Sequence, residues 1–465
     1  MNLFKNNSKE INEATPLLFL AGPMFLELLL NICINNVDTL MLSHYSETAV
    51  GAVGNANQVM FLLILMFNII ATATSVIVAQ YLGAKQHEKM NTIYTLSVIV
   101  NLVMGIVLSL LFVTFKGTIL GMLKVPADMV NEAEIYINIV GGGLFLQAVY
   151  NVMLQILRCN GYAKVGMYIS IVINLINVVG NYLFLYGPLE FLKLGVAGAA
   201  IPTVFARLSA VVISIAFFYR KKIGKFAIKY ITPFPGKMLL EMIKIGLPSA
   251  GENMFYNMYQ LILLSFINGF GSDAVNAKVY CQSLIAFAMI FSNAAAMGTQ
   301  IIVGHLVGAG KEDAAYRRAF ATLKVSLPIT IGLAIANMLL SPFTLRLFTS
   351  NQEIIHIGFF IMAVDIVIET GRCLNMTFVS SLKAAGDYIF PLVVGIITMY
   401  GLGVTVGYTM GVIVGFGVAG VFAGTAADEF IRGLIVMNRW RRKKWLGKAI
   451  VKSDETGKKE FEEEN

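Results

Sequence analysis

The chain has 465 residues, of which 57% are hydrophobic and 13% are charged. Soluble domains carry about 25% charged residues, so the composition excludes an ordinary soluble protein and predicts an all-α polytopic membrane protein. The net charge of +8 does not indicate a nucleic-acid partner, because the basic residues lie in short loops, where they set membrane topology. The first apolar run is too long for a cleavable signal peptide, so none is predicted.

Twelve apolar stretches of about 20 residues or more predict twelve membrane-spanning helices. The first six are expected at residues 16–42, 52–82, 93–115, 134–157, 166–187 and 195–219. The other six are expected at residues 242–268, 277–306, 320–346, 355–382, 389–411 and 415–438. The predicted domains are therefore an N-lobe (1–219), a connector (220–241), a C-lobe (242–438) and a charged tail (439–465) whose end, from Ser453, is expected to be disordered.

Lys and Arg are concentrated in every second connection between these stretches. The connector is the richest, with Arg220, Lys221, Lys222, Lys225, Lys229 and Lys237. The positive-inside rule therefore predicts that both termini and the connector face the cytoplasm. We expect a multi-pass protein of a bacterial plasma membrane, in contact with membrane lipid.

The two halves of the chain match at a constant shift of 225 residues. Glu27 then corresponds to Glu252, and TSVIVAQYLGA from Thr74 corresponds to TQIIVGHLVGA from Thr299. The same shift matches LRCNG around Arg158 with LKAAG around Lys383. A shift that stays constant from Glu27 to Arg158 indicates two homologous six-helix halves. Because six is even, the halves have the same orientation, and a binding cavity is expected between such parallel repeats.

The first predicted helix carries a polar face. Its members, within about 80° of one another around the axis, are Glu27, Asn31, Asn35 and Asp38. A carboxylate at membrane depth is costly and usually marks an ion or substrate path, so we predict a functional role for Asp38. For the asparagines the alternative is a helix-packing seam, because amides can bond across helices.

Asparagines also share one face of the fifth predicted helix, at Asn174, Asn177 and Asn181. Together with Asp38 they offer one charged oxygen and several amide oxygens, which suits a proton site or a hard cation such as Na⁺. The four cysteines and four histidines show no soft-metal pattern, so no cofactor is expected beyond the coupling ion. An amide ladder that only joins helices is the alternative.

The second half is not a copy of the first, because Asp38 corresponds to Leu263. Its polar residues are Glu252, Asn253, Tyr256, Asn257 and Gln260 on one helix and Asp365, Glu369 and Arg372 on another. Glu369 and Arg372 are neighbours at i, i+3 and are predicted to pair. The acids without an evident local cation are Glu27, Asp38, Glu252 and Asp365, so the cavity is expected to favour cations or protons.

The sequence resembles the multidrug and toxic compound extrusion (MATE) transporters over about residues 14–445. The segments that carry the resemblance are VDTLMLSHYSETAVGAVG, TSVIVAQYLGAK, INLINVVGNYLFLYG, GLPSAGENMFYN and SLKAAGDYIFPL. The resemblance implies twelve helices in two six-helix lobes that form a V. It also implies export of cationic amphipathic compounds against an inward flow of H⁺ or Na⁺.

The resemblance further implies a cation site in the first lobe. Its positions fall on Asp38, Asn151, Asn177, Asn181 and Thr203, with a possible Na⁺ held by Asp38, Asn177 and Asn181. Many members have Asp where this chain has Asn181, which leaves the choice between H⁺ and Na⁺ open. Another branch of the family uses a Glu and an Asp in the second lobe, for which Glu252 and either Asp365 or Glu369 are the candidates.

We therefore predict a monomeric cation-coupled antiporter that exports small cationic amphipathic compounds by alternating access. The alternative is a lipid-linked saccharide flippase of the same superfamily, which the excess of carboxylates disfavours. An enzyme is not expected, because the four histidines, His44, His87, His305 and His356, are scattered among helix ends and loops.

Overall fold

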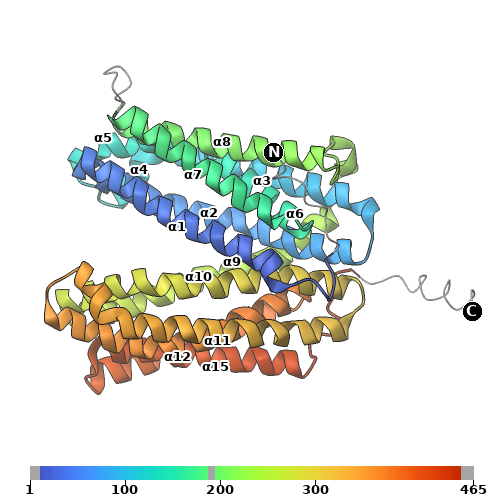
Figure 1. Cartoon of the computed structure of the whole chain (residues 1–465). Helices are drawn as coiled ribbons and strands as arrows, with labels where there is room; N and C mark the ends of the chain where they lie inside the picture. Colours follow the sequence, from blue (N-terminus) through green and yellow to red (C-terminus); the bar gives the residue numbers. More distant parts are fainter. Residues whose placement is uncertain (1–10, 187–193, 452–465) are drawn as a thin grey trace, which may run out of the picture. The chain divides into compact units, whose positions relative to one another are not determined.

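The computed structural model of the protein describes residues 11–186 and 194–451, shown in Figure 1. Every regular element in these residues is a helix, which confirms the predicted all-α class. The described chain divides into two compact units. Unit 1 contains Leu26–Val78 and Gln86–Gly246, and unit 2 contains Ile11–Phe25, Ala79–Lys85 and the chain from Leu247 onward.

The elements follow one another with short connections. Up to the connector they are α1 (Leu17–Tyr45), α2 (Glu47–Gly83), the 3-10 turn η1 (His87–Lys89), α3 (Met90–Thr114), α4 (Lys116–Met122), α5 (Ala127–Tyr136), the π-helix η2 (Ile137–Gly141), α6 (Leu144–Cys159), α7 (Ala163–Tyr186) and α8 (Val196–Arg220). Inside unit 1, α7 packs on α8 and α3 packs on α6.

After the 3-10 turn η4 (Ile228–Ile231), the chain enters the second set of helices. These are α9 (Gly236–Asn268), α10 (Ser272–Gly308), α11 (Glu312–Thr344), the 3-10 turn η5 (Leu345–Leu347), α12 (Gln352–Ala384), α13 (Ile389–Ile396), the π-helix η6 (Ile397–Val404), α14 (Thr405–Tyr408), the π-helix η7 (Thr409–Ile413) and α15 (Gly417–Arg441). Inside unit 2, α12 packs against α10, α11 and α15.

Nine described helices are long and apolar enough to cross a membrane, and one bent pair makes a tenth. Each of the twelve predicted spans corresponds to one long helix or to one broken run of helices. The two long helices outside the apolar set are α9 and α15, which carry many of the polar residues described below. The polytopic helical fold is therefore as predicted.

Two predicted spans are interrupted. The fourth begins at Ala127 instead of residue 134, and bends by 43° between Gly141 and Leu144. Three consecutive glycines, Gly141 to Gly143, stand at this bend, where glycine's low helix propensity and a π-helix favour a kink. The eleventh span contains two π-helical stretches, η6 and η7, in a glycine-rich segment.

Those glycines let the eleventh span approach α15 closely. A Cβ atom at Gly411 would stand 2.6 Å from the Val421 side chain, and one at Gly420 would stand 2.6 Å from the Met410 backbone. Small residues on both surfaces allow this approach, as in other membrane helix pairs. The contact positions α15, whose charged residues then face α12.

The boundaries around the connector and the tail differ from the predicted ones. Helix α9 begins at Gly236, so the end of the predicted connector is already helical. Helix α15 continues to Arg441, and the two tryptophans near its end, Trp440 and Trp445, are buried and stack at 4.2 Å between ring centroids. The expectation of disorder from Ser453 lies outside the described residues.

Within unit 2, the last turns of α2 and α10 touch through glycine. The backbone of Gln80 lies where a Cβ of Gly308 would stand, and the backbone of His305 lies where a Cβ of Gly83 would stand. These four residues correspond in pairs at the 225-residue shift, so the contact is reciprocal. The buried Gln80 side chain also donates to Ala384 O at 2.6 Å and accepts from Ile450 N at 2.8 Å.

Replacing Gly308 by Ala is expected to destabilise the protein by about 1–3 kcal/mol, because the added methyl group overlaps backbone that cannot move away easily. Gly332 is the control, since it is also helical but has nothing within 4 Å of the position that an added methyl group would take. There the same change should stabilise by up to about 1 kcal/mol. Unfolding in mixed micelles measures the stability of both variants. Equal changes in Gly308→Ala and Gly332→Ala would contradict the close contact between α2 and α10.

Candidate cation-coupling site

In unit 1, the predicted polar face of α1 points toward α7. Asn181 Nδ2 donates to Asp38 Oδ1 at 2.8 Å, and Ser170 Oγ donates to Asn31 Oδ1 at 3.0 Å. No basic side chain in the described residues lies within ion-pair distance of Asp38. Asp38 is half-buried, so water solvates its charge only in part. No basic partner in the described chain neutralises that charge either. Nothing is described of the Asn35 side chain.

The asparagines of α7 are buried and incompletely bonded. Asn177 and Asn181 are 8% and 2% exposed, and the Oδ1 atom of each has no hydrogen-bond donor among the described residues. Buried amide oxygens normally have a partner. A proton on Asp38 can serve as a donor to such an oxygen, and Na⁺ can bind it directly. These residues therefore fit either coupling ion and do not choose between them.

Two other residues assigned to this site bond elsewhere. Asn151 on α6 accepts from Gln147 at 2.7 Å and donates to Asn68 on α2 at 3.3 Å. Thr203 on α8 donates to the backbone O of Ala199 in its own helix at 3.0 Å. Neither side chain hydrogen-bonds Asp38; among the predicted residues only Asn181 does, and Asn177 lies one helical turn before it with an unbonded amide oxygen.

The expectation that Glu27 has no cationic partner is wrong. Arg158, at the end of α6, places Nη2 at 2.8 Å from Glu27 Oε2, and both side chains are nearly fully buried. A buried acid is retained at such depth because a basic group compensates it. Glu27 is therefore paired and is no candidate for ion coupling.

The same expectation is wrong for Glu252. Lys383 Nζ lies 2.6 Å from Glu252 Oε2, and each side chain is 14% exposed. Glu252 and Lys383 are the counterparts of Glu27 and Arg158 at the 225-residue shift. The repeat thus carries one duplicated ion pair, and the shift that revealed the repeat already matched both partners. Asn253 beside it donates to Ser249 O in its own helix.

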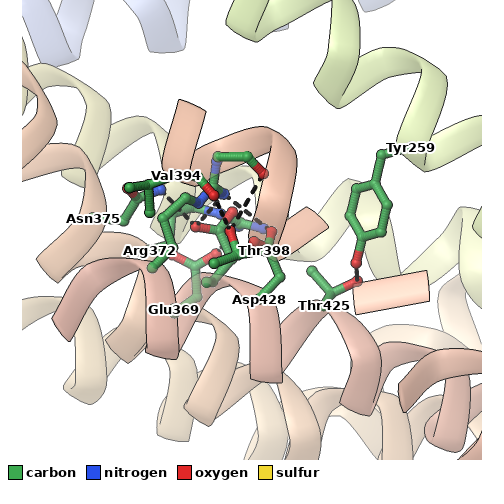
Figure 2. A network of polar contacts seen from close by, with 11 residues as sticks. Tyr259, Glu369, Arg372, Asn375, Val394, Thr398, Thr425 and Asp428 are labelled. Atoms are coloured by element: carbon green, nitrogen blue, oxygen red, sulfur yellow. Dashed lines mark hydrogen bonds and ion pairs between the residues drawn. The ribbon is translucent and has the colours of Figure 1, made fainter. Parts of the chain in front are cut away.

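A buried ionic network joins α12 to α15, shown in Figure 2. Arg372 pairs with Glu369, as predicted, and also lies 3.5 Å from Glu429. Arg432 lies 3.2 Å from Asp428 and 3.0 Å from Glu429. Glu429 therefore connects the charged residues of α15 to Arg372 on α12. Three carboxylates share two guanidinium groups, so the network carries a net negative charge if all are ionised.

Asp365 stands one helical turn before Glu369 and has no partner. It is 1% exposed, and neither carboxylate oxygen has a hydrogen-bond donor among the described residues. Asp365 lines a cavity of about 300 Å³ within unit 2. The polar residues that line it with Asp365 are Tyr256, Gln260, Lys278, Gln282, Arg372 and Thr425.

The structure therefore brings together only part of the predicted second-lobe site. Tyr256, Gln260, Asp365 and Arg372 line the cavity, whereas Glu252 and Asn253 do not. The sequence interpretation missed Lys278, Gln282 and Thr425. Lys278 was missed because the predicted span began at residue 277, whereas α10 begins at Ser272 and places Lys278 within the helix.

Duplicated helices, most of them apolar enough to span a membrane, and acids at membrane depth without a basic partner among the described residues are features of polytopic membrane transporters. A model of the MatE family matches residues 23–183 and 248–409. The chain belongs to this family of membrane transporters.

Similarity extends over nearly the whole chain. An uncharacterised transporter, YisQ of Bacillus subtilis, is 34% identical over 451 residues, covering 97% of this chain and 99% of that one. A probable multidrug resistance protein, NorM of Thermotoga maritima, is 23% identical and covers 97% of each chain. Among solved structures, an outward-facing multidrug resistance MATE family transporter matches with a TM-score of 0.86 at 18% identity, covering 94% of this chain and 98% of that one.

Proposed function

We propose that this protein is a cation-coupled antiporter that exports cationic amphipathic compounds by alternating access, with H⁺ or Na⁺ as the coupling ion. The observation that supports it most directly is Asp38. Asp38 is a half-buried acid whose hydrogen-bond partner is an amide and not a basic group. By contrast, every fully buried acid in the described chain except Asp365 has a basic partner. A carboxylate without a counterion attracts either a small cation or a cationic substrate.

Antiport follows if these two ligands compete for the same negative charge. A proton or Na⁺ at Asp38 removes the charge and weakens binding of the organic cation. Release of the ion restores the negative charge and the affinity for the organic cation. Thermodynamic linkage makes the effect reciprocal, so a bound organic cation also weakens binding of the ion. A transporter that changes access while holding one ligand or the other then exchanges them.

The relatives named as multidrug resistance proteins support the substrate class of this proposal. Asp38, an acid without a basic partner among the described residues, favours a cationic substrate over an anionic lipid-linked saccharide. The distribution of Lys and Arg supports cytoplasmic termini in a bacterial plasma membrane. We further propose that the protein acts as a monomer, because each proposed site is complete within one chain.

Proteoliposomes loaded with the purified protein test this function. A fluorescent organic cation is added, and either a pH gradient or a Na⁺ gradient is imposed. The fluorescent cation should accumulate in exchange for the ion of one of the two gradients. For one-to-one exchange with H⁺, its concentration ratio across the membrane should reach up to about tenfold per pH unit. An ionophore that dissipates the gradient should abolish the movement. Movement that depends on neither gradient would refute antiport.

A further inference from the structure

The connector between α8 and α9 has a composition that ordinary loops do not have. From Arg220 to Leu240 it contains six basic residues and no acidic residue. Lys222, Lys225, Lys229 and Lys237 are exposed, and none makes an ion pair with any described residue. These four lysines therefore concentrate positive charge that no acid among the described residues pairs with.

The connector is also held in a defined conformation. Lys225 N donates to Asn91 Oδ1 at the start of α3, at 2.7 Å. The Phe226 ring stacks on Phe218 of α8 at 4.4 Å between centroids, and η4 packs on α3. The segment is thus fixed to the ends of α3 and α8, although it is a connection between two long helices.

Two large apolar side chains project from this fixed segment. Ile228 is 74% exposed and Phe234 is 61% exposed. The connector leaves the apolar helix α8 at Arg220 and enters the long helix α9 at Gly236, and the predicted twelve-span topology puts both ends at the same membrane surface. Apolar side chains gain free energy by leaving water, and at this location the acyl-chain boundary is the nearest apolar medium.

We propose that the connector together with the first residues of α9, residues 220–237, is a docking surface for anionic phospholipid. Ile228 and Phe234 insert at the boundary between headgroups and acyl chains, and the lysines bind the anionic headgroups. Apolar and basic residues combined in this way are typical of interfacial segments. Each Lys near an anionic surface contributes about a fivefold preference, so the group discriminates strongly against zwitterionic lipid. The partner is the membrane leaflet that this surface faces.

Site-specific fluorescence quenching tests the contact. Cys33, the exposed cysteine among the four, is first replaced by Ser, and the variant Ile228→Cys is labelled with an environment-sensitive fluorophore. The protein is reconstituted in vesicles that contain one anionic and one zwitterionic phospholipid, with bromine atoms on the acyl chains of only one of them. Bromine on the anionic lipid should quench the probe several-fold more than bromine on the zwitterionic lipid. A label at Asn268, at the end of α9, should show no preference.

The charge requirement has a matched control. Replacing Lys222, Lys225 and Lys229 by Gln should remove the preference, whereas replacing the exposed Arg441, Arg442 and Lys444 by Gln should leave it unchanged. Equal quenching by the two lipids in the unmodified connector, or a preference that survives loss of the three lysines, would overturn the proposal. The readout is lipid contact and not transport, so it does not depend on the coupling mechanism.

Discussion

Asp38→Asn is expected to abolish gradient-driven export while the protein continues to fold and binds an organic cation only as weakly as the native protein with Asp38 protonated. Asn has nearly the same shape as Asp and can keep the contact with Asn181 that now measures 2.8 Å. It cannot take up a proton, and it offers Na⁺ no charge. The variant therefore removes the coupling and leaves the packing.

The sign of the pH dependence follows from the same argument. In the native protein, lowering the pH protonates Asp38, removes its charge and weakens binding of an organic cation. Coupling between two ligands of one protein typically amounts to about 5- to 150-fold in affinity. The dissociation constant of a fluorescent cation should therefore rise within that range as the pH falls, and should be independent of pH in Asp38→Asn.

Asp365→Asn is the matched variant in unit 2, because Asp365, like Asp38, has no basic partner among the described residues. If coupling resides at Asp38, this variant keeps its gradient dependence, although its substrate preference can change through the 300 Å³ cavity. The opposite result, with export lost only in Asp365→Asn, would place the coupling acid in unit 2.

The sequence was sufficient for the fold because the length of the apolar stretches and the repeat at a constant shift can both be read directly from the chain. It was also sufficient for the contact between Asp38 and Asn181, since helical periodicity placed each on a polar face. It was not sufficient for the partners of Glu27 and Glu252. Those lie more than 100 residues away along the chain, and no helical period connects such distant positions.

The break after Gly141 and the joining of Glu429 to Arg372 show the same limitation. Propensity identifies a glycine triplet as weak helix, but the bend depends on what packs around it. Similarly, the ion pairs within α12 and within α15 can be predicted from their i, i+3 and i, i+4 spacing. The link between α12 and α15 cannot, because it depends on how closely the glycine-rich eleventh span packs on α15 and so positions it. Tertiary packing decides both.

Arg158→Ala is expected to have the largest effect on stability. It leaves Glu27 buried at 3% exposure without a cation, and removing one partner of a buried ion pair costs about 3–5 kcal/mol. Lys383→Ala removes the equivalent cation of the second repeat, where both side chains are 14% exposed. Water can partly solvate Glu252 there, so the expected loss is smaller. Unfolding in mixed micelles compares the free energy of unfolding of Arg158→Ala with that of Lys383→Ala.

A double variant separates the value of the pair from the cost of an isolated charge. In Glu27→Gln/Arg158→Met no buried charge remains, and replacing a buried pair by groups of similar volume is often close to neutral. We therefore expect the double variant to regain most of the stability that Arg158→Ala loses. If it were as unstable as the single variant, the ion pair itself would be required for folding. If Arg158→Ala cost no more than Lys383→Ala, the difference in burial would have no energetic consequence, and the duplicated pairs would be equivalent.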